Sequence, residues 1–146
     1  MAQLSGKLNT FKKALDSLNA AINTWRSLQE ADVGTKLMAR DSLVQRFEYT
    51  TDLFWKVVKT YLQEESNIVL ESVSPSGIIR SAVHEKLFSE LDGMACIEMI
   101  KSRNITSHVY HEETAQVIAQ KIPEYGELMQ RLTTRIISRA RDGEYI

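Results

Sequence analysis

Hydrophobic residues near the start of the chain recur at alternating steps of four and three positions. This spacing places them on one side of an α-helix, because a helix turns about 100° per residue. Charged residues lie between them and are expected to face water. The pattern predicts a first helix with a buried stripe that consists of Leu4, Leu8, Phe11, Leu15, Leu18, Ile22 and Trp25.

A second helix of similar length and period is predicted from Thr35 or Lys36 to Glu64, after a turn around Asp32 and Gly34. Two helices that match in this way are expected to pack as an antiparallel hairpin. The buried stripe of the second helix is predicted to consist of Leu43, Phe47, Thr50, Phe54, Val57 or Val58, and Tyr61.

The helical period disappears between Ser66 and Pro75. The short apolar run from Ile68 to Leu70 has no second strand to pair with, so a loop packed against the bundle is expected. Ser74 suits the N-cap of a short third helix, with Pro75 at its first position. The buried side of this helix is predicted to be Ile78, Ile79, Ala82, Val83 and Leu87.

Two further helices follow. Steps of three join the apolar residues of a fourth helix, namely Leu91, Met94, Ile97 and Ile100. The last helix is long and starts with Glu112 and Glu113, which suit a helix N-terminus, and Pro123 is expected to kink it. Its stripe is Ala115, Ile118, Ile122, Tyr125, Leu128 or Met129, Leu132 and Ile136. The predicted fold class is therefore all-α: an up-and-down helical bundle of four main helices plus one short helix, in a single domain over residues 1–146.

Two polar lines run along these helices. Glu48, Asp52 and Lys56 recur at steps of four in the second helix, and Arg131, Arg135 and Arg139 do so in the last one. A line of this kind is typical of a face exposed to solvent. For the arginines, an edge that binds a partner is the second interpretation.

Composition narrows the function classes. With 146 residues, 43% of them hydrophobic, the chain suits one buried core, and a net charge of −1 gives no overall attraction to nucleic acid or anionic membranes. A single cysteine, Cys96, favours a reduced, cytoplasmic setting. No apolar run approaches the ~18 residues of a membrane span. Three histidines and one cysteine show no metal-ligand spacing, and no glycine-rich phosphate loop is present, so no metal or cofactor is predicted.

The candidate chemistry lies between the last two long helices, where Arg103, His108 and Tyr110 follow one another at a spacing of five and two. A guanidinium suits phosphate, and an imidazole exchanges protons near neutral pH. On a continuous helix Arg103 and His108 would point about 140° apart, so they converge only if the helix breaks between them. Alternatively, the three residues only complement a helix dipole, bind a free carbonyl and pack a ring.

Several stretches together resemble one family: Arg46-Phe47-Glu48-Tyr49-Thr50, Leu53-Phe54-Trp55-Lys56, Ser74-Pro75 before Ile78-Ile79-Arg80, and Arg103-Asn104-Ile105-Thr106-Ser107-His108-Val109-Tyr110. In this order they resemble the nucleotidyltransferase substrate-binding proteins of the HEPN superfamily, over roughly residues 4–132. The resemblance implies a helical homodimer encoded beside a minimal nucleotidyltransferase. Arg-x4-His-x-Tyr is the form of the superfamily's ribonuclease motif that is linked to toxin–antitoxin pairs.

Three functions remain open at this point. The first is a substrate-binding subunit that serves a minimal nucleotidyltransferase, since this chain lacks the aspartate pair that such transfer needs. The second is a metal-independent endoribonuclease in which His108 is the general base and Arg103 stabilises the phosphorane, with RNA as the partner. The third is a structural helical adaptor.

Specific roles follow from the resemblance and from the chemistry of the side chains. Arg103, His108 and Asn104 are the candidate catalytic residues, and two copies of the motif are expected to share a cleft in the homodimer. Tyr110 is the candidate acceptor of a nucleotidyl group. The candidate substrate-binding residues are Glu48, Lys56 and Arg80, and Glu48 is also expected to orient Arg103 through an ion pair.

Overall fold

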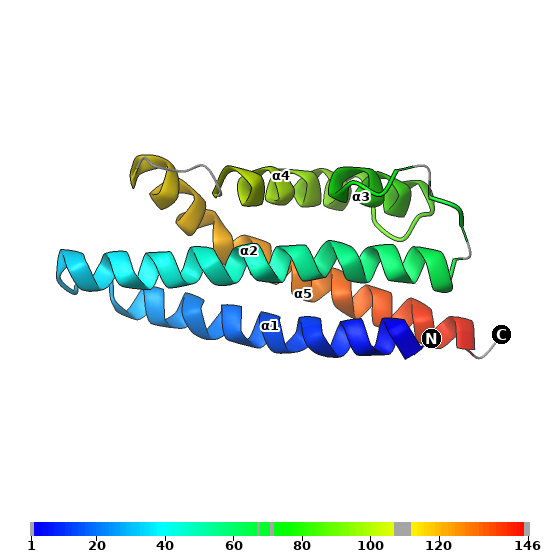
Figure 1. Ribbon diagram of the computed structural model, residues 1–146, viewed down its shortest axis with the longest axis horizontal. Coiled ribbons are helices and arrows are strands. Elements are labelled where there is room, and N and C mark those ends of the chain that lie inside the picture. Colours follow the sequence, from blue (N-terminus) through cyan, green and yellow to red (C-terminus); the bar gives the residue numbers. More distant parts are fainter. Residues whose placement is uncertain (1, 67, 71, 107–111, 145–146) are drawn as a thin grey trace.

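Five helices form the bundle in the part of the chain that the structure describes (Figure 1). The computed structural model describes residues 2–66, 68–70, 72–106 and 112–144, and within these ranges it contains no strand. The helices are α1 (Ala2–Ser27), α2 (Val33–Glu64), α3 (Pro75–His84), α4 (Glu90–Thr106) and α5 (Glu112–Glu144). The prediction of four long helices and one short helix is confirmed.

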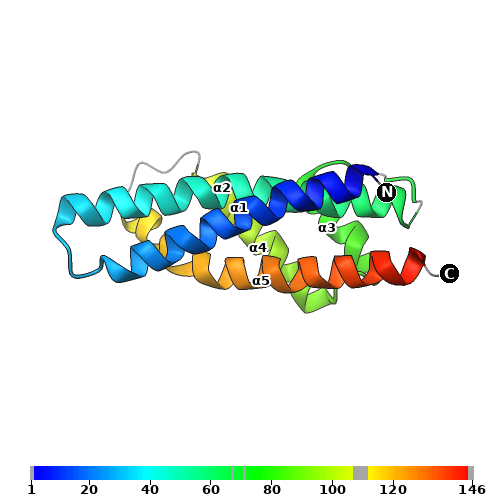
Figure 2. The ribbon, with the colours of Figure 1, turned by 90° about the horizontal axis from the view of Figure 1, so that it is seen from below.

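Helices α1 and α2 form the predicted antiparallel hairpin, and α5 packs against both of them (Figures 1 and 2). Helices α3 and α4 pack on one another and on α2. Helix α2 thus contacts each of the other four described helices. No helix in the described ranges combines the length and the apolar character that a membrane span requires.

The hydrophobic core follows the predicted stripes of α1, α2 and α5. Phe11, Phe47 and Phe54 are fully buried, and Leu132 and Ile136 are also buried completely. Aromatic rings connect α2 with its neighbours: the centre of the Phe54 ring lies 5.8 Å from the ring centre of Phe11 and 6.3 Å from that of Phe88. Pro123 lies inside α5, whose ribbon changes direction in its N-terminal part (Figure 1), as the loss of a backbone N–H is expected to cause.

The capping residues explain where two helices begin. The side chain of Ser74 accepts a hydrogen bond from the backbone N–H of Gly77 at 3.1 Å, with Pro75 in the first turn, as predicted. Asp32 caps α2 in the same way by accepting from the Thr35 N–H at 2.9 Å. Helix α2 therefore begins at Val33, two or three residues before the predicted start, because Asp32 acts as a cap and Gly34 is helical.

The predicted stripe of α4 is wrong at its first two positions, whereas Ile100 is buried and Ile97 packs against the core as predicted. Leu91 and Met94 are 78% and 65% exposed, whereas the buried side of the helix consists of Gly93, Cys96, Met99, Ile100 and Ser102. Gly93 faces α3, where an added Cβ would lie 2.3 Å from the Cγ2 of Val83. The close approach of α3 thus selects a face of α4 that contains the smallest residue, and the larger apolar residues remain outside.

Arg131 and Arg135 are exposed, as expected for a solvated line, but all three arginines of this line also bind groups outside α5. Arg131 forms a two-point contact with the carboxylate of Asp92, at 2.9 and 3.0 Å. Arg135 donates from Nε to the Leu87 carbonyl at 2.5 Å, and Arg139 donates to the Lys86 carbonyl at 3.2 Å. These contacts attach the α3–α4 connection and the first turn of α4 to α5.

Replacing Phe54 with Ala is expected to lower the free energy of unfolding by about 3 to 5 kcal/mol, because its fully buried ring packs against the rings of Phe11 and Phe88. Tyr49→Ala is the control, since Tyr49 is 56% exposed on the same helix and should change stability by about 0.5 kcal/mol or less. Urea unfolding measures both. A loss for Phe54→Ala that does not exceed the loss for Tyr49→Ala would contradict the assigned core.

The Asp92–Arg131 pair should make stability depend on pH. The hydrogen bonds from Arg131 lower the pKa of the Asp92 carboxyl, so the pair stabilises the fold above the ordinary carboxyl pKa, and this contribution disappears as pH falls through the lowered pKa. Because Arg131 is 60% exposed, Asp92→Asn should cost only about 1 kcal/mol or less at pH 7.

Urea unfolding of wild type and Asp92→Asn at pH 7, and then at values below about pH 4, measures this difference. The two proteins should converge as the pH decreases, while Asp16→Asn, an exposed change on α1, should show no comparable pH-dependent gap. A gap for Asp92→Asn that stays constant with pH would argue against the ion pair.

Candidate functional site

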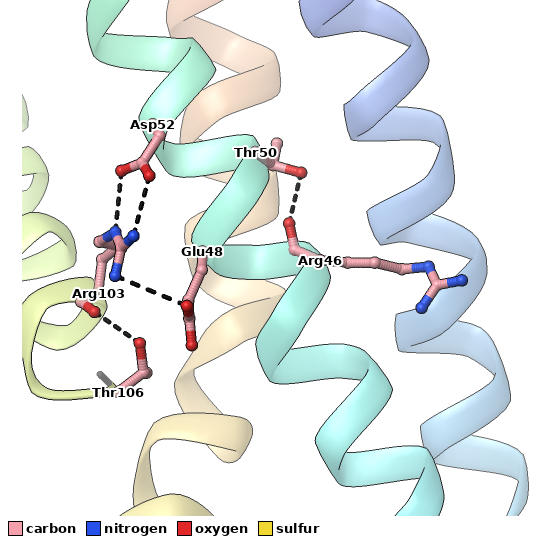
Figure 3. Close-up of polar contacts among 6 residues, drawn as sticks. All are labelled: Arg46, Glu48, Thr50, Asp52, Arg103 and Thr106. Carbon is pink, nitrogen blue, oxygen red and sulfur yellow. Dashed lines mark hydrogen bonds and ion pairs between the residues drawn. The ribbon is translucent and has the colours of Figure 1, made fainter. Parts of the chain in front are cut away.

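Arg103 lies in the last turn of α4, and its side chain points toward α2 (Figure 3). Its Nε donates to Oδ1 of Asp52 and its Nη2 donates to Oδ2 of the same carboxylate, both at 2.9 Å. Nη1 lies 3.7 Å from Oε2 of Glu48. Two carboxylates of α2 therefore surround one guanidinium of α4.

The two carboxylates meet Arg103 because they lie four residues apart on α2, which places them on one face of the helix. This face is turned toward α4, so the interpretation of the polar line as a solvated face does not hold for Glu48 and Asp52. Glu48 pairs with Arg103 as expected from the sequence. The closer, two-point partner is Asp52, which the sequence argument did not assign to Arg103.

The electrostatics of this cluster favour a fixed cation. Hydrogen bonding to Asp52 is the main cause that raises the pKa of Arg103, while partial burial acts in the opposite direction and Glu48 adds a smaller attraction. The Arg103 side chain is only 21% exposed. Since a two-point guanidinium–carboxylate contact fixes both distance and plane, the direction of the guanidinium is set by α2.

Neighbouring contacts hold this end of α4 in place. The hydroxyls of Ser102 and Tyr125 are 3.0 Å apart in a buried hydrogen bond, and the ring of Tyr125 stacks on Phe47 at 5.5 Å. These contacts join α4, α5 and α2 beside Arg103. The backbone next to Arg103 is therefore held by a hydrogen bond to α5.

Helix α4 ends at Thr106, whose Oγ1 donates to the carbonyl of Arg103 at 2.6 Å. The helix break that was predicted between Arg103 and His108 falls on residues outside this described range. His108 and Tyr110 themselves lie outside the described residues, so their convergence with Arg103 stays a prediction. Asn104 lies on α4 and is exposed to solvent.

The other candidate binding residues are distributed around the bundle. Lys56 is exposed one turn beyond Asp52, with its Nζ 5.8 Å from the centre of the Trp55 ring, and it lines a small cavity with residues of α1. Arg80 lies on α3 beside the N-terminal end of α4, whereas Arg103 is near the C-terminal end. The structure therefore does not group Arg80 with Arg103.

Arg46, which is part of the resemblance, points to the opposite side of α2 (Figure 3). Its Nε donates to Oγ of Ser17 at 3.0 Å, and it also contacts Ser42. Its backbone carbonyl accepts from Thr50 at 2.7 Å. Arg46 therefore connects α2 to α1. Among the described residues there is also no group of three His, Cys, Asp or Glu side chains placed to hold a metal ion.

Comparison with known proteins places this arrangement in a family. Residues 6–138 match the family model described as nucleotidyltransferase substrate binding protein like. The chain belongs to this family. The matched region includes α2, α4 and therefore the cluster around Arg103. A search of curated proteins gave no match.

Solved structures share the fold of this nucleotidyltransferase substrate binding protein-like chain. A protein from Thermus thermophilus is 31% identical, with 90% of this chain and 98% of that one covered and a TM-score of 0.72. A chain of a mutant toxin–antitoxin complex MntA-HpeT is 12% identical, with 94% and 99% covered and a TM-score of 0.75. A chain of the tri-AMPylated Shewanella oneidensis HEPN toxin in complex with MNT antitoxin is 13% identical, with 92% and 96% covered and a TM-score of 0.73.

Asp52 and Glu48 should differ in the strength of their energetic coupling to Arg103, because their contacts with it are unequal. Asp52→Asn combined with Arg103→Gln in a double-mutant cycle should show a coupling of about 1 kcal/mol, since the contact is two-point and partly buried. Glu48→Gln with Arg103→Gln should couple by less than about 0.5 kcal/mol, because this ion pair spans 3.7 Å, which is longer than a hydrogen bond. Urea unfolding measures both cycles, and an equal or larger coupling for Glu48 would refute the assigned geometry.

Proposed function

We propose that this chain is the helical, substrate-binding partner of a separate minimal nucleotidyltransferase, in a pair of the toxin–antitoxin kind. The observation that carries the proposal is the match of residues 6–138 to the nucleotidyltransferase substrate binding protein-like family. The fold shared with chains of the MntA-HpeT complex and of the HEPN toxin–MNT antitoxin complex supports it. The homodimer expected from the resemblance, with two copies of the motif at a shared cleft, belongs to the same proposal.

Within this function, Arg103 has the role of a fixed cation in the last turn of α4. Asp52 and Glu48 hold its guanidinium against α2. Because Asp52 already occupies two of its donors, the guanidinium can position a neighbouring group without changing its own direction. We assign Arg103 as a positioning residue, and we assign His108 and Asn104 to the same functional segment on the evidence of the sequence.

We propose Tyr110 as the acceptor of the nucleotidyl group. The phenol oxygen would attack the α-phosphorus of ATP, the bond to pyrophosphate would break, and the phenol proton would pass to a base of the partner enzyme. A phenol with a pKa near ~10 is a poor nucleophile, so the partner must supply activation. The description of the Shewanella oneidensis HEPN toxin as tri-AMPylated supports a modification of this kind.

An added adenylyl group would bring negative charge next to the motif. A phosphodiester close to Arg103 and His108 would repel an RNA phosphate and occupy space that substrate needs. This gives the partner enzyme a means of inactivating the motif without a tight complex. It also links the binding function to the second candidate, an endoribonuclease that uses Arg103 and His108.

We place the endoribonuclease second for a structural reason. A guanidinium that is paired with two carboxylates must be released, at least in part, before it can stabilise a phosphorane. Lys56 and Arg80 do not lie with Arg103 in a common cluster. The third candidate, a structural adaptor, would give Arg103, His108 and Tyr110 no chemical role.

Intact mass after incubation with the partner nucleotidyltransferase, Mg²⁺ and ATP tests the proposal. Wild type should gain the mass of one or more adenylyl groups, and Tyr110→Phe should lose at least one of them. Tyr49→Phe is the matched control, because Tyr49 is an exposed tyrosine on α2, and it should behave as wild type.

The same adduct in wild type and Tyr110→Phe, or no adduct in either, would reject Tyr110 as the acceptor. The endoribonuclease alternative is tested by incubating the unmodified protein with mixed RNA in the presence of chelator. Cleavage that persists in chelator and disappears in His108→Ala would move the endoribonuclease to first place.

A further inference from the structure

A second basic region lies at the other end of α4, in a cleft between α3, the beginning of α4 and α5. The cleft has a volume of about 840 Å³ and is lined by Arg80, His84, Lys86 and Arg135. Arg80 and His84 are exposed one turn apart on α3. Glu90 in this cleft is about 20 Å from Arg103 along α4 at 1.5 Å per residue, so the two regions are separate.

Contacts from α5 build one wall of this cleft. The hydrogen bond from Nε of Arg135 to the Leu87 carbonyl anchors the guanidinium by one nitrogen. Its two terminal nitrogens have no hydrogen-bond partner in the described part of the chain. Lys86 has a left-handed backbone, with φ of 62°, and its carbonyl is bound by Arg139. The turn that contains Lys86 is therefore held in place by a hydrogen bond from α5.

The acidic residues of the cleft do not cancel these cations. Asp92 lines the cleft, but both of its carboxylate oxygens are bound by Arg131. Glu90 is the other carboxylate among the described lining residues. The described lining thus contains three cationic side chains and one histidine. Glu90 is its only carboxylate that is not bound at two points by an arginine. This balance contrasts with the net charge of −1 for the whole chain.

The remaining wall of the cleft is apolar. Val83, Phe88, Met94 and Ile97 line it, and the side chain of Met94 extends from α4 with 65% exposure. Gly93 lets the helices approach closely, because any Cβ there would collide with Val83. A cationic rim and an apolar wall therefore face the same space.

We propose that this cleft binds a nucleotide-sized organic phosphate, with its phosphates at Arg80, Lys86 and Arg135 and its organic part against Met94 and Ile97. Pockets of about 300 to 1,000 Å³ commonly hold such ligands. Guanidinium and ammonium groups are the usual ligands of phosphate, and the polarizable side chain of methionine suits a planar ring. The inference rests on the lining of the cleft and does not depend on the proposed function.

Calorimetric titration of the purified full chain in chelator tests the site, with ATP, inorganic triphosphate and adenosine as probes. Arg80→Gln combined with Lys86→Asn should raise the dissociation constant for ATP at least about tenfold, since two phosphate-binding cations are lost. Both positions are exposed, and asparagine tolerates the left-handed backbone at position 86. Met94→Gln should weaken binding of ATP and leave binding of triphosphate unchanged.

Lys12→Gln combined with Lys13→Gln is the matched control, because it removes the same charge from exposed positions of α1. This control should change the dissociation constant by less than about twofold, as expected for charges screened at a distance. Circular dichroism of each variant confirms that the helices are intact.

Three results would overturn the proposal. These are no binding of ATP by wild type, equal weakening in the cleft and control variants, and binding of inorganic triphosphate as tight as that of ATP. The last result would show that the apolar wall contributes nothing. All titrations use this chain alone, so their failure is distinguishable from a failure of adenylylation, which requires the partner enzyme.

Discussion

Helix α2 has to pack against all four other described helices, and this requirement sets the arrangement of the bundle. Its buried residues therefore point in several directions: Phe54 reaches both Phe11 of α1 and Phe88 before α4, while Phe47 stacks on Tyr125 of α5. The charged side chains of α2 lie outside this buried set. One line of these side chains faces α4 and carries Glu48 and Asp52, so the packing of apolar faces determines where the carboxylates of the candidate site lie.

Helix α4 depends on this frame more than the other long helices do, because its buried side is narrow and partly small or polar, with Gly93 and Ser102 at its ends. A guanidinium–carboxylate contact with two hydrogen bonds fixes it at each end. Arg131 of α5 holds Asp92 near the N-terminal end, and Arg103 near the C-terminal end is held by Asp52 of α2. These charged contacts have directional geometry, which apolar packing lacks. They fix the rotation of α4 relative to α2 and α5.

Local periodicity was sufficient to predict the helices of the bundle and most of its core. The stripes of α1, α2 and α5 are long enough to define one face, and Ser74-Pro75 marks the start of α3 by its own chemistry. The stripe of α4 was wrong because Leu91 and Met94 satisfy the helical period as well as Cys96 and Met99 do. The choice between these faces depends on the close approach of α3 at Gly93, which is not encoded in the α4 sequence alone.

The same limit applies to the polar lines. The steps of four at Glu48–Asp52 and at Arg131–Arg135 predict that side chains share a face, but they do not say whether water or another helix covers it. Asp52 could have been found as a partner of Arg103 only by combining its spacing from Glu48 with the expected packing of α4 on α2. Pairing between helices depends on tertiary contacts that single-helix patterns do not contain.

The two basic regions of the molecule differ in how their charge is balanced, and this difference limits what each can bind. At Arg103, two carboxylates compete with any incoming phosphate, so an anion gains little there unless it displaces Asp52. In the cleft beside α3, the principal acidic neighbour, Asp92, is itself neutralised by Arg131, and the cations face an open space with an apolar wall. Because attraction of an anion depends on the net local charge rather than on the number of cations, the cleft is the better anion site and the Arg103 cluster is the better positioning device. Arg103, the motif arginine that the carboxylates already bind, is therefore better suited to holding an acceptor side chain than to the initial capture of a phosphate.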